Sequence, residues 1–312
     1  MKHNVKITVI LLVMFFVTQL IGLAVIHAYS PKQESIFNQT TGQQETINVT
    51  QQLPYGMQPP EDLDPGFSLG TLITSFVIAI ALIFLLSKIR ATIFLKFWFF
   101  TVVVIALGLT LNPFLKLFAQ EYAGYLAVVI ALPLAFYKIF KRNMVVHNLT
   151  ELLIYPGIAA VFVPILNLWT VIVLLLLISL YDMYAVWHSG FMQKMAKFQI
   201  EELKFFAGFF IPYVSKKDRA KIVEAKKSNS LKSLKKVKVN LAILGGGDVV
   251  FPIITAGVVL RMWGLVPALM ISVFATLALL WLFTFAKKGK FYPAMPFITI
   301  GCLLGILVGW IL

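Results

Sequence analysis

Nine long apolar stretches dominate this chain and constrain what it can fold into. Crossing the hydrocarbon core of a bilayer as a helix takes about 20 apolar residues. Hydrophobic residues make up 60% of the 312 residues and charged residues 13%, which is too apolar for a soluble domain. The sequence therefore predicts an all-α polytopic membrane protein with nine transmembrane helices, at Ile7–Ala28, Ser68–Ser87, Leu95–Leu117, Tyr122–Phe140, Leu152–Leu166, Leu168–Trp187, Val239–Leu260, Met262–Ala286 and Ala294–Leu312.

Local signals decide two of these assignments. The fifth and sixth stretches are almost continuous, but Pro164 and Asn167 favour a turn, so we separate the helices there. The first stretch follows Lys2 and Lys6, as in a signal peptide. Its apolar run is too long for a typical signal-peptide core, so we expect a retained helix.

Basic residues predict the orientation in the membrane. Of the 27 Lys and Arg residues, 24 fall on one side of the predicted helices, and thirteen of them lie in the loop 190–238. The loop 29–67, on the other side, holds five acids and one base. Because cytoplasmic loops are enriched in Lys and Arg, we expect a cytoplasmic N-terminus and a C-terminus outside. The net charge of +14 is thus explained by topology, and no nucleic-acid partner is expected.

The loops divide the chain into residues 1–188, with six helices, a basic cytoplasmic loop 189–238, and residues 239–312, with three helices. The outer loop 29–67 is rich in Gln, Thr and Pro and is expected to be extended or flexible. It carries glycosylation sequons at Asn38 and Asn48. In the inner loop, Met and Phe recur at helical spacing over residues 191–198, which predicts an amphipathic helix on the membrane surface. Residues 216–238 are interpreted as a solvated basic linker.

Two acidic residues lie inside apolar stretches, where a charge is costly and usually functional. Asp182 is in the sixth predicted helix and Asp248 in the seventh, about 12 and 13 Å of helix from the same cytoplasmic edge. No Lys or Arg lies at their depth, and the other eleven acids, including Glu121 and Glu151, are assigned to loops or helix ends. Since the two helices run antiparallel, the two carboxyl groups are expected to face each other.

Two facing carboxyl groups in an apolar site can share one proton. The ionised group can take a proton from water while the protonated group polarises the carbonyl of a peptide bond. This chemistry requires neither a metal nor a cofactor, and we expect neither. The lone Cys302 excludes an intrachain disulfide, and the four histidines lack metal-ligand spacing and are interpreted as interfacial: His3, His27, His147 and His188.

The backbone around Asp248 is unusual. Gly245, Gly246 and Gly247 precede it, and Pro252 follows it by four residues. Glycines loosen a helix and let neighbouring helices approach, and Pro252 has no N–H for the carbonyl of Asp248. Alternatively, the glycines serve only close packing between helices, and Pro252 is an ordinary proline of a membrane helix. With an acid between these residues, we favour an irregular, water-accessible helix.

Three motifs resemble those of a known family. Tyr181-Asp182 and Gly245-Gly246-Gly247-Asp248 are similar to the Tyr-Asp and Gly-x-Gly-Asp motifs of presenilins and signal peptide peptidases, which are intramembrane aspartyl proteases. The segment Pro293-Ala294-Met295-Pro296 resembles their Pro-Ala-Leu motif, with Met295 in place of leucine. Residues 267–269 spell Pro-Ala-Leu but lie near the outer end of the eighth stretch, and we do not assign them to the motif. The chain is most similar to the microbial presenilin-type members.

The resemblance implies roles for these residues. Asp182 and Asp248 would be catalytic, and the substrate-binding positions would be Tyr181, Gly245, Gly247, Pro293, Ala294, Met295 and Pro296. Tyr181 would support its neighbour Asp182, and the two glycines would permit close approach. The prolines leave nearby carbonyls free, with which an unwound substrate strand could pair. The substrates would be transmembrane helical proteins cleaved within the bilayer, and no obligate partner subunits are expected for so short a chain.

Two other functions are compatible with a membrane protein that has two buried acids. A proton-coupled transporter could use the two buried aspartates as a relay. It would predict more polar residues along several helices and an internal repeat, and the sequence contains neither. A non-enzymatic scaffold or chaperone would tolerate loss of one acid, whereas both are present. The sequence therefore favours an intramembrane aspartyl protease.

Overall fold

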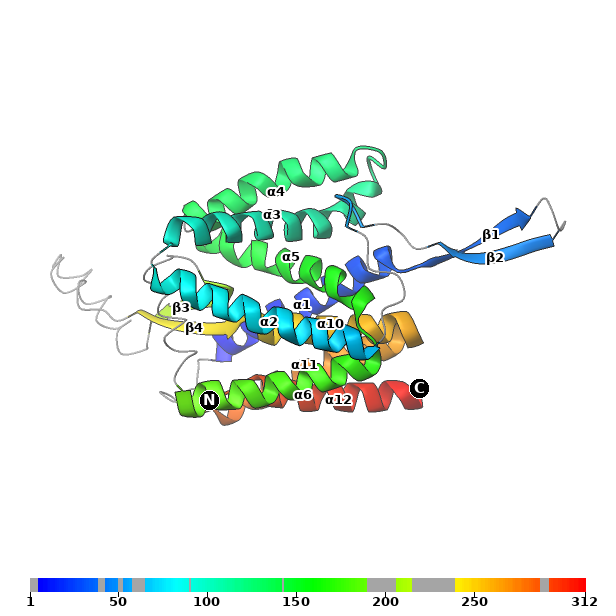
Figure 1. Ribbon diagram of the computed structural model, residues 1–312. Helices are drawn as coiled ribbons and strands as arrows, with labels where there is room; N and C mark the ends of the chain where they lie inside the picture. Colours follow the sequence, from blue (N-terminus) through cyan, green and yellow to red (C-terminus); the bar gives the residue numbers. More distant parts are fainter. Residues whose placement is uncertain are drawn as a thin grey trace.

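The chain forms a bundle of membrane-type helices with a β-hairpin at each end (Figure 1). The computed structural model describes residues 5–38, 43–49, 53–57, 65–89, 91–141, 143–189, 206–214, 239–286 and 292–312. Within these ranges there are nine α-helices, of which seven are long and apolar enough to cross a membrane, while α12 and part of α2 are shorter apolar helices. The predicted helical, polytopic class is confirmed. The two hairpins were not predicted.

Most helix limits agree with the sequence prediction to within a few residues. The sixth helix continues into a π-helical turn over Ala185–Ser189. The fifth ends in a 3₁₀ turn over Val163–Ile165, and Asn167 caps the sixth through a reciprocal pair of hydrogen bonds with Thr170. The predicted separation at Pro164–Asn167 is therefore confirmed. The helices are α1 (Val5–Tyr29), α2 (Pro65–Lys88), α3 (Thr92–Lys116), α4 (Ala123–Phe140), α5 (Met144–Phe162), α6 (Leu168–Tyr184), α10 (Gly246–Trp263), α11 (Leu265–Phe285) and α12 (Met295–Ile311).

The start of α5 differs from the prediction. The helix begins at Met144, eight residues before Leu152, because the side chain of Asn143 accepts hydrogen bonds from the first free N–H groups of the helix. The added turns carry His147 and Glu151, which are both buried. His147 lies in the first turn of α5, whereas Glu151 lies a turn further in, so the prediction that Glu151 lies at a helix end was wrong.

The start of the seventh helix also differs. Residues Val239–Gly245 form a strand, β4, and the helix α10 begins only at Gly246. Strand β4 pairs antiparallel with β3 (Gly208–Val214), in a register from Gly208↔Gly245 to Val214↔Val239. The three glycines weaken the helix at its N-terminal end, and β3 supplies backbone partners for the extended chain that precedes it. The expected irregularity before Asp248 is thus a change from strand to helix.

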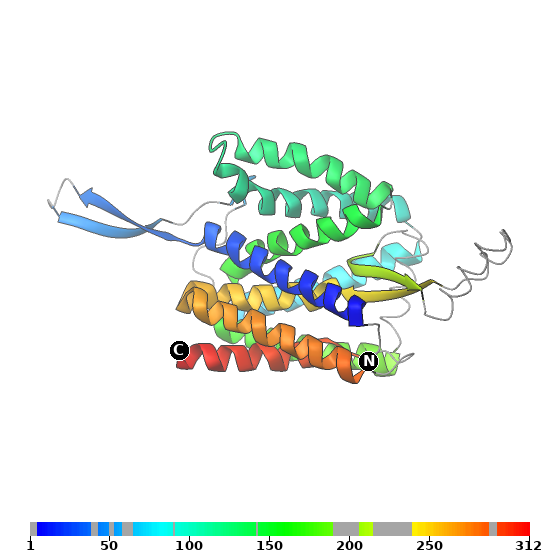
Figure 2. The ribbon, with the colours of Figure 1, turned by 180° about the vertical axis from the view of Figure 1, so that it is seen from behind.

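A second hairpin forms part of the outer loop. Strand β1 (Lys32–Asn38) pairs antiparallel with β2 (Gln43–Val49), in agreement with the extended chain expected there. It projects from the opposite end of the bundle to β3 and β4 (Figures 1 and 2). The predicted amphipathic helix at 191–198 and the basic linker at 216–238 lie outside the described residues.

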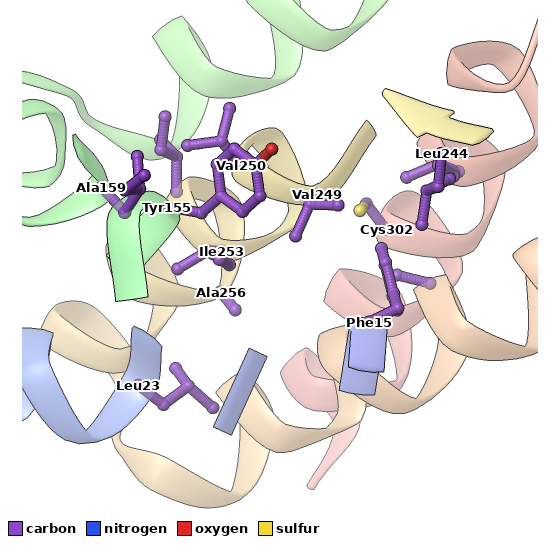
Figure 3. Close-up of a cluster of buried hydrophobic side chains, with 14 of the residues drawn as sticks. Phe15, Leu23, Tyr155, Ala159, Leu244, Val249, Val250, Ile253, Ala256 and Cys302 are labelled. Atoms are coloured by element: carbon purple, nitrogen blue, oxygen red, sulfur yellow. The ribbon is translucent and has the colours of Figure 1, made fainter. Parts of the chain in front are cut away.

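Helix α10, which carries Asp248, lies at the centre of the bundle. It packs against α1, α5, α6, α11 and α12. Figure 3 shows side chains of α1 and α5 around it, and all of those named here are buried: Phe15 and Leu23 from α1, Tyr155 and Ala159 from α5, and Val249, Ile253 and Ala256 from α10. Contact from several neighbours holds the start of α10 in a defined position.

Candidate active site

The two aspartates predicted to act together lie on adjoining helices. Asp182 is in the last turn of α6 and Asp248 in the first turn of α10, and the two helices pack against each other. Their carboxyl groups are close enough to interact electrostatically. The C-terminal end of α6 and the N-terminal end of α10 both lie toward the end of the bundle that carries β3 and β4 (Figure 1). Asp248 reaches this position next to an extended segment, instead of nine residues into a helix as the sequence suggested.

The Pro293–Pro296 segment contacts Asp182 through its backbone. The N–H of Met295, the first residue of α12, donates a hydrogen bond of 3.1 Å to Oδ2 of Asp182. The first N–H groups of a helix have no partner within the helix, so a carboxylate can satisfy one of them. Asp182 is only 4% exposed. Sequence reasoning missed this contact because a backbone donor leaves no residue-type signal.

Hydroxyl groups one turn further along hold α6 against α12. The hydroxyls of Ser179 and Thr299 lie 2.7 Å apart, and Thr299 also donates a hydrogen bond of 3.4 Å to the carbonyl of Leu175. Both hydroxyl residues are buried. These hydrogen bonds fix the position of α12 along the axis of α6, and therefore hold Met295 next to Asp182.

Tyr181 lies beside Asp182 in the chain but in a different environment. Its side chain is 45% exposed. In the part of the chain that the structure describes, the carboxylate of Asp182 accepts a hydrogen bond from the backbone N–H of Met295. Support of Asp182 by Tyr181 stays a prediction, and the exposed ring is free to contact another molecule.

The three glycines before Asp248 have different surroundings. A Cβ atom at Gly245 would lie 3.2 Å from Oδ2 of Asp248, so the carboxylate lies against this residue. A Cβ at Gly246 would lie 2.7 Å from the hydroxyl of the buried Tyr155. At Gly247 it would meet only the ring of Phe251, at 3.8 Å. The restriction on side-chain size is therefore strongest at Gly246, which the motif comparison had left as the variable position.

A side chain of α1 supports the backbone next to Asp248. Buried Gln19 donates a hydrogen bond of 3.1 Å from Nε2 to the carbonyl of Val249. Helix α10 continues through Pro252, which cannot donate to the carbonyl of Asp248. The irregular start of α10 is thus held in part by a donor from another helix.

The backbone groups of β3 and β4 have a defined direction. Asn148 of α5 bonds to both backbone groups of Phe210: its Nδ2 donates to the carbonyl at 2.9 Å, and its Oδ1 accepts from the N–H at 3.2 Å. Phe210 therefore points its backbone groups away from β4. In an antiparallel pair, the residue opposite points its own groups away as well. Ile243, which is opposite Phe210, accordingly directs its N–H and carbonyl to the outer edge of β4, as does Gly245 opposite Gly208.

No group of three or more His, Cys, Asp or Glu residues within the described ranges could hold a metal ion.

The chain also matches a protein family at the level of sequence. The profile described as "Signal-peptide peptidase, presenilin aspartyl protease" matches residues 57–312. Fold and family together define the class as a multi-pass integral membrane protein that acts as an aspartic endopeptidase within the membrane. The chain belongs to the signal peptide peptidase and presenilin family.

Solved structures show the same fold over nearly the whole chain. One, of a presenilin family intramembrane aspartate protease in space group C222, has a TM-score of 0.60 at 18% identity and covers 97% of this chain and 98% of that chain. A second, of a presenilin family intramembrane aspartate protease in space group P2, has a TM-score of 0.58 at 19% identity and covers 96% of each chain. Comparison with curated protein sequences gives no match.

Proposed function

We propose that Asp182 and Asp248 are the catalytic pair that hydrolyses peptide bonds of transmembrane helices. The observation that carries the proposal is the packing of α6 against α10, with Asp182 in the last turn of one and Asp248 in the first turn of the other. The start of α12 adds a backbone donor to Asp182. One carboxylate removes a proton from water, and the resulting hydroxide attacks the peptide carbonyl while the protonated carboxyl donates to its oxygen. Collapse of the tetrahedral intermediate then breaks the C–N bond: the leaving amine takes the proton that the first carboxylate removed from water, and a hydroxyl of the intermediate returns a proton to the second.

The hydrogen bond from Met295 orients Asp182 for this reaction. It holds Oδ2 of the carboxylate in place at the start of α12. Positioning of catalytic groups to within about 1 Å is worth roughly a hundredfold in rate. The Pro293–Pro296 segment therefore acts on the chemistry through Asp182 as well as on the substrate.

The substrate segment must leave its helical conformation before its amides can be attacked, and its backbone groups then need partners within the membrane. We propose that the unwound segment pairs as a strand with the outer edge of β4, where Ile243 and Gly245 direct their backbone groups. Strand β4 ends at Gly245, and Asp248 follows in the first turn of α10. Tyr181, Gly245, Gly247 and residues 293–296 (Pro293, Ala294, Met295 and Pro296) would line the substrate on either side.

Orientation, chain division and independence from partners are also part of the proposal. The basic loop supports a cytoplasmic N-terminus, an outside C-terminus and an active site in the cytoplasmic half of the membrane. The parts 1–188 and 239–312 each contribute one aspartate, and 189–238 connects them on the cytoplasmic side. We propose that the chain cleaves its substrates without obligate partner subunits.

A cleavage assay with purified components tests the function. The purified chain in liposomes should cut a labelled membrane-spanning peptide, and hydroxyl-containing analogues of the tetrahedral intermediate should inhibit it. Failure to cut any of a panel of such peptides would contradict both the activity and the independence from partners. Proton flux coupled to solute uptake in the same liposomes would instead support the transporter.

A further inference from the structure

The outer edge of β3 is already occupied, and by side chains of α5 rather than by another strand. Asn148 takes both backbone groups of Phe210, as a neighbouring strand would. One residue before it in the chain, His147 places Nε2 2.9 Å from the carbonyl of Gly208. Gly208 and Phe210 are alternate residues of β3, so these two contacts cover consecutive bonding positions along one edge.

The chemistry of its neighbours assigns the protonation of His147. The carbonyl of Gly208 can only accept, so Nε2 must carry a hydrogen. On the other side of the ring, the ammonium of Lys138 lies 3.3 Å from Nδ1 and can only donate, so Nδ1 must be the acceptor. His147 is therefore a neutral ring in one tautomer, fixed between a donor from α4 and an acceptor from β3.

A buried ion pair holds this arrangement in place. Lys138 of α4 also bonds to Glu151, which lies one turn beyond His147 on α5. Oε1 of Glu151 is 3.5 Å from Nε2 of His147 as well. All three side chains are buried, and a buried charge is retained only where it is paired and hydrogen-bonded. Because Glu151 pairs with Lys138, the ammonium group stays buried beside Nδ1 of His147, and Nε2 remains directed at β3.

Ring contacts reinforce the attachment of β3 to α5. The ring of Phe210 lies 4.6 Å from that of His147, and the ring of Phe209 lies 5.8 Å from that of Tyr155, edge to face. Phe209 is fully buried. A hairpin of two strands is marginally stable alone, so its order depends on such packing against a helix.

We propose that His147 and Asn148 act as positioning residues that hold the β3–β4 hairpin formed before substrate arrives and reserve substrate pairing for the edge of β4. The edge assignment rests on the proposed function, whereas formation of the hairpin does not. Because Gly245 of β4 is followed directly by α10, a formed hairpin also fixes the approach to Asp248. Substrate binds only to the fraction of molecules in which the hairpin is formed, so loss of these contacts raises KM.

A matched pair of variants at one residue tests the proposal. His147→Gln places an amide donor near the position of Nε2, whereas His147→Asn is one carbon shorter and cannot reach Gly208. Amide hydrogen exchange would be measured on the full chain without substrate, at the hairpin amides that bond between strands, such as Phe209, Ile211 and Leu244. We expect protection in the unsubstituted chain and in His147→Gln, and at least tenfold faster exchange in His147→Asn.

Cleavage kinetics give the second readout. KM should rise about tenfold in His147→Asn and stay within threefold of the unsubstituted chain in His147→Gln. Asn148→Ser, at a half-buried position and too short to bond to Phe210, should give the same effect as His147→Asn, and it decides the question if His147→Asn does not fold. Thermal unfolding of each variant separates hairpin opening from global destabilisation.

Three results would overturn the proposal. An unprotected hairpin in the unsubstituted chain would show that it is not formed before binding. Exchange in His147→Asn and Asn148→Ser as slow as in the unsubstituted chain would show that these side chains do not hold it. Substrate crosslinking through a photoreactive residue at Phe210 as efficiently as at Ile243 would show that the β3 edge is open. Asp248→Asn should leave the exchange unchanged, so failure of the catalytic assignment is distinguishable from failure of this one.

Discussion

The hydroxyl of Tyr155 lies so close to Gly246 that a Cβ at this glycine would be 2.7 Å from the oxygen and 2.9 Å from the ring. Tyr155 belongs to α5 and is buried, and Gly246 starts α10 two residues before Asp248. The contact places the N-terminal end of α10 directly on α5. Any side chain at Gly246 must displace either the ring or the backbone next to the aspartate.

This contact predicts that Gly246→Ala is more damaging than Gly247→Ala. The added methyl group at Gly246 should lower the free energy of unfolding by about 1–3 kcal/mol, as overpacking does. Gly247→Ala meets only ordinary contact and should be neutral or stabilising by up to about 1 kcal/mol, because alanine favours a helix. Unfolding in detergent would measure both. Greater destabilisation by Gly247→Ala would contradict the packing described for Gly246.

The hydroxyl contact between α6 and α12 predicts a second effect. Thr299→Val keeps the shape but removes the partner of Ser179, and hydrogen bonds between membrane helices are worth about 0.6–1.7 kcal/mol. The change should slow cleavage more than it lowers stability, because α12 also carries the donor to Asp182. Thr299→Ser retains the hydroxyl and is the control. Equal cleavage rates in the two variants would exclude a role for this contact in placing α12.

The buried pair of Lys138 and Glu151 predicts non-additive stability. Lys138→Met leaves Glu151 buried without its partner and should cost about 3–5 kcal/mol. Adding Glu151→Leu removes the unpaired charge, so the double variant should recover most of this loss. A double-mutant cycle of unfolding free energies measures the coupling. Losses that simply add would mean that the two charges do not depend on each other.

The orientation predicts which loops are accessible from each side. A cysteine replacing Ser35, in the outer hairpin, should react with an impermeant label in intact cells, whereas one replacing Ser228, in the basic loop, should react only after permeabilisation. Cys302 is buried and should not interfere. Labelling at Ser228 in intact cells would reverse the orientation and place the active site in the outer half of the membrane.

The sequence predicted most of the helices because a membrane span needs a long apolar run. It singled out Asp182 and Asp248 because isolated intramembrane charges are rare, and the two residues lie on helices that pack against each other. It did not predict β4, since an apolar strand and the first turns of an apolar helix have the same composition. The partner strand β3 lies in a basic loop whose charge pattern gave no sign of it. Backbone contacts such as that of Met295 leave no trace in residue type.

The sequence contains a sign that Glu151 lies within a helix. Glu151 was placed at a helix edge because the apolar run begins after it, yet His147 and Glu151 are four residues apart, which places them on the same face of a helix. Lys138, treated as an orientation signal, is buried with them. Polar residues at helical spacing beside an apolar run can therefore extend a membrane helix when another helix supplies the opposite charge.

Cleavage by the purified Asp182→Asn and Asp248→Asn variants tests the central claim most directly. Asparagine keeps the shape, and its Oδ1 can still accept the hydrogen bond from Met295, so both variants should fold with nearly unchanged unfolding temperatures. Neither amide can share a proton with the remaining carboxyl group, so both should lose cleavage of a labelled transmembrane peptide, by about a thousandfold or more if each removes roughly 4 kcal/mol of transition-state stabilisation. Cleavage at the unsubstituted rate by either folded variant would contradict the assignment of these two residues as the catalytic pair.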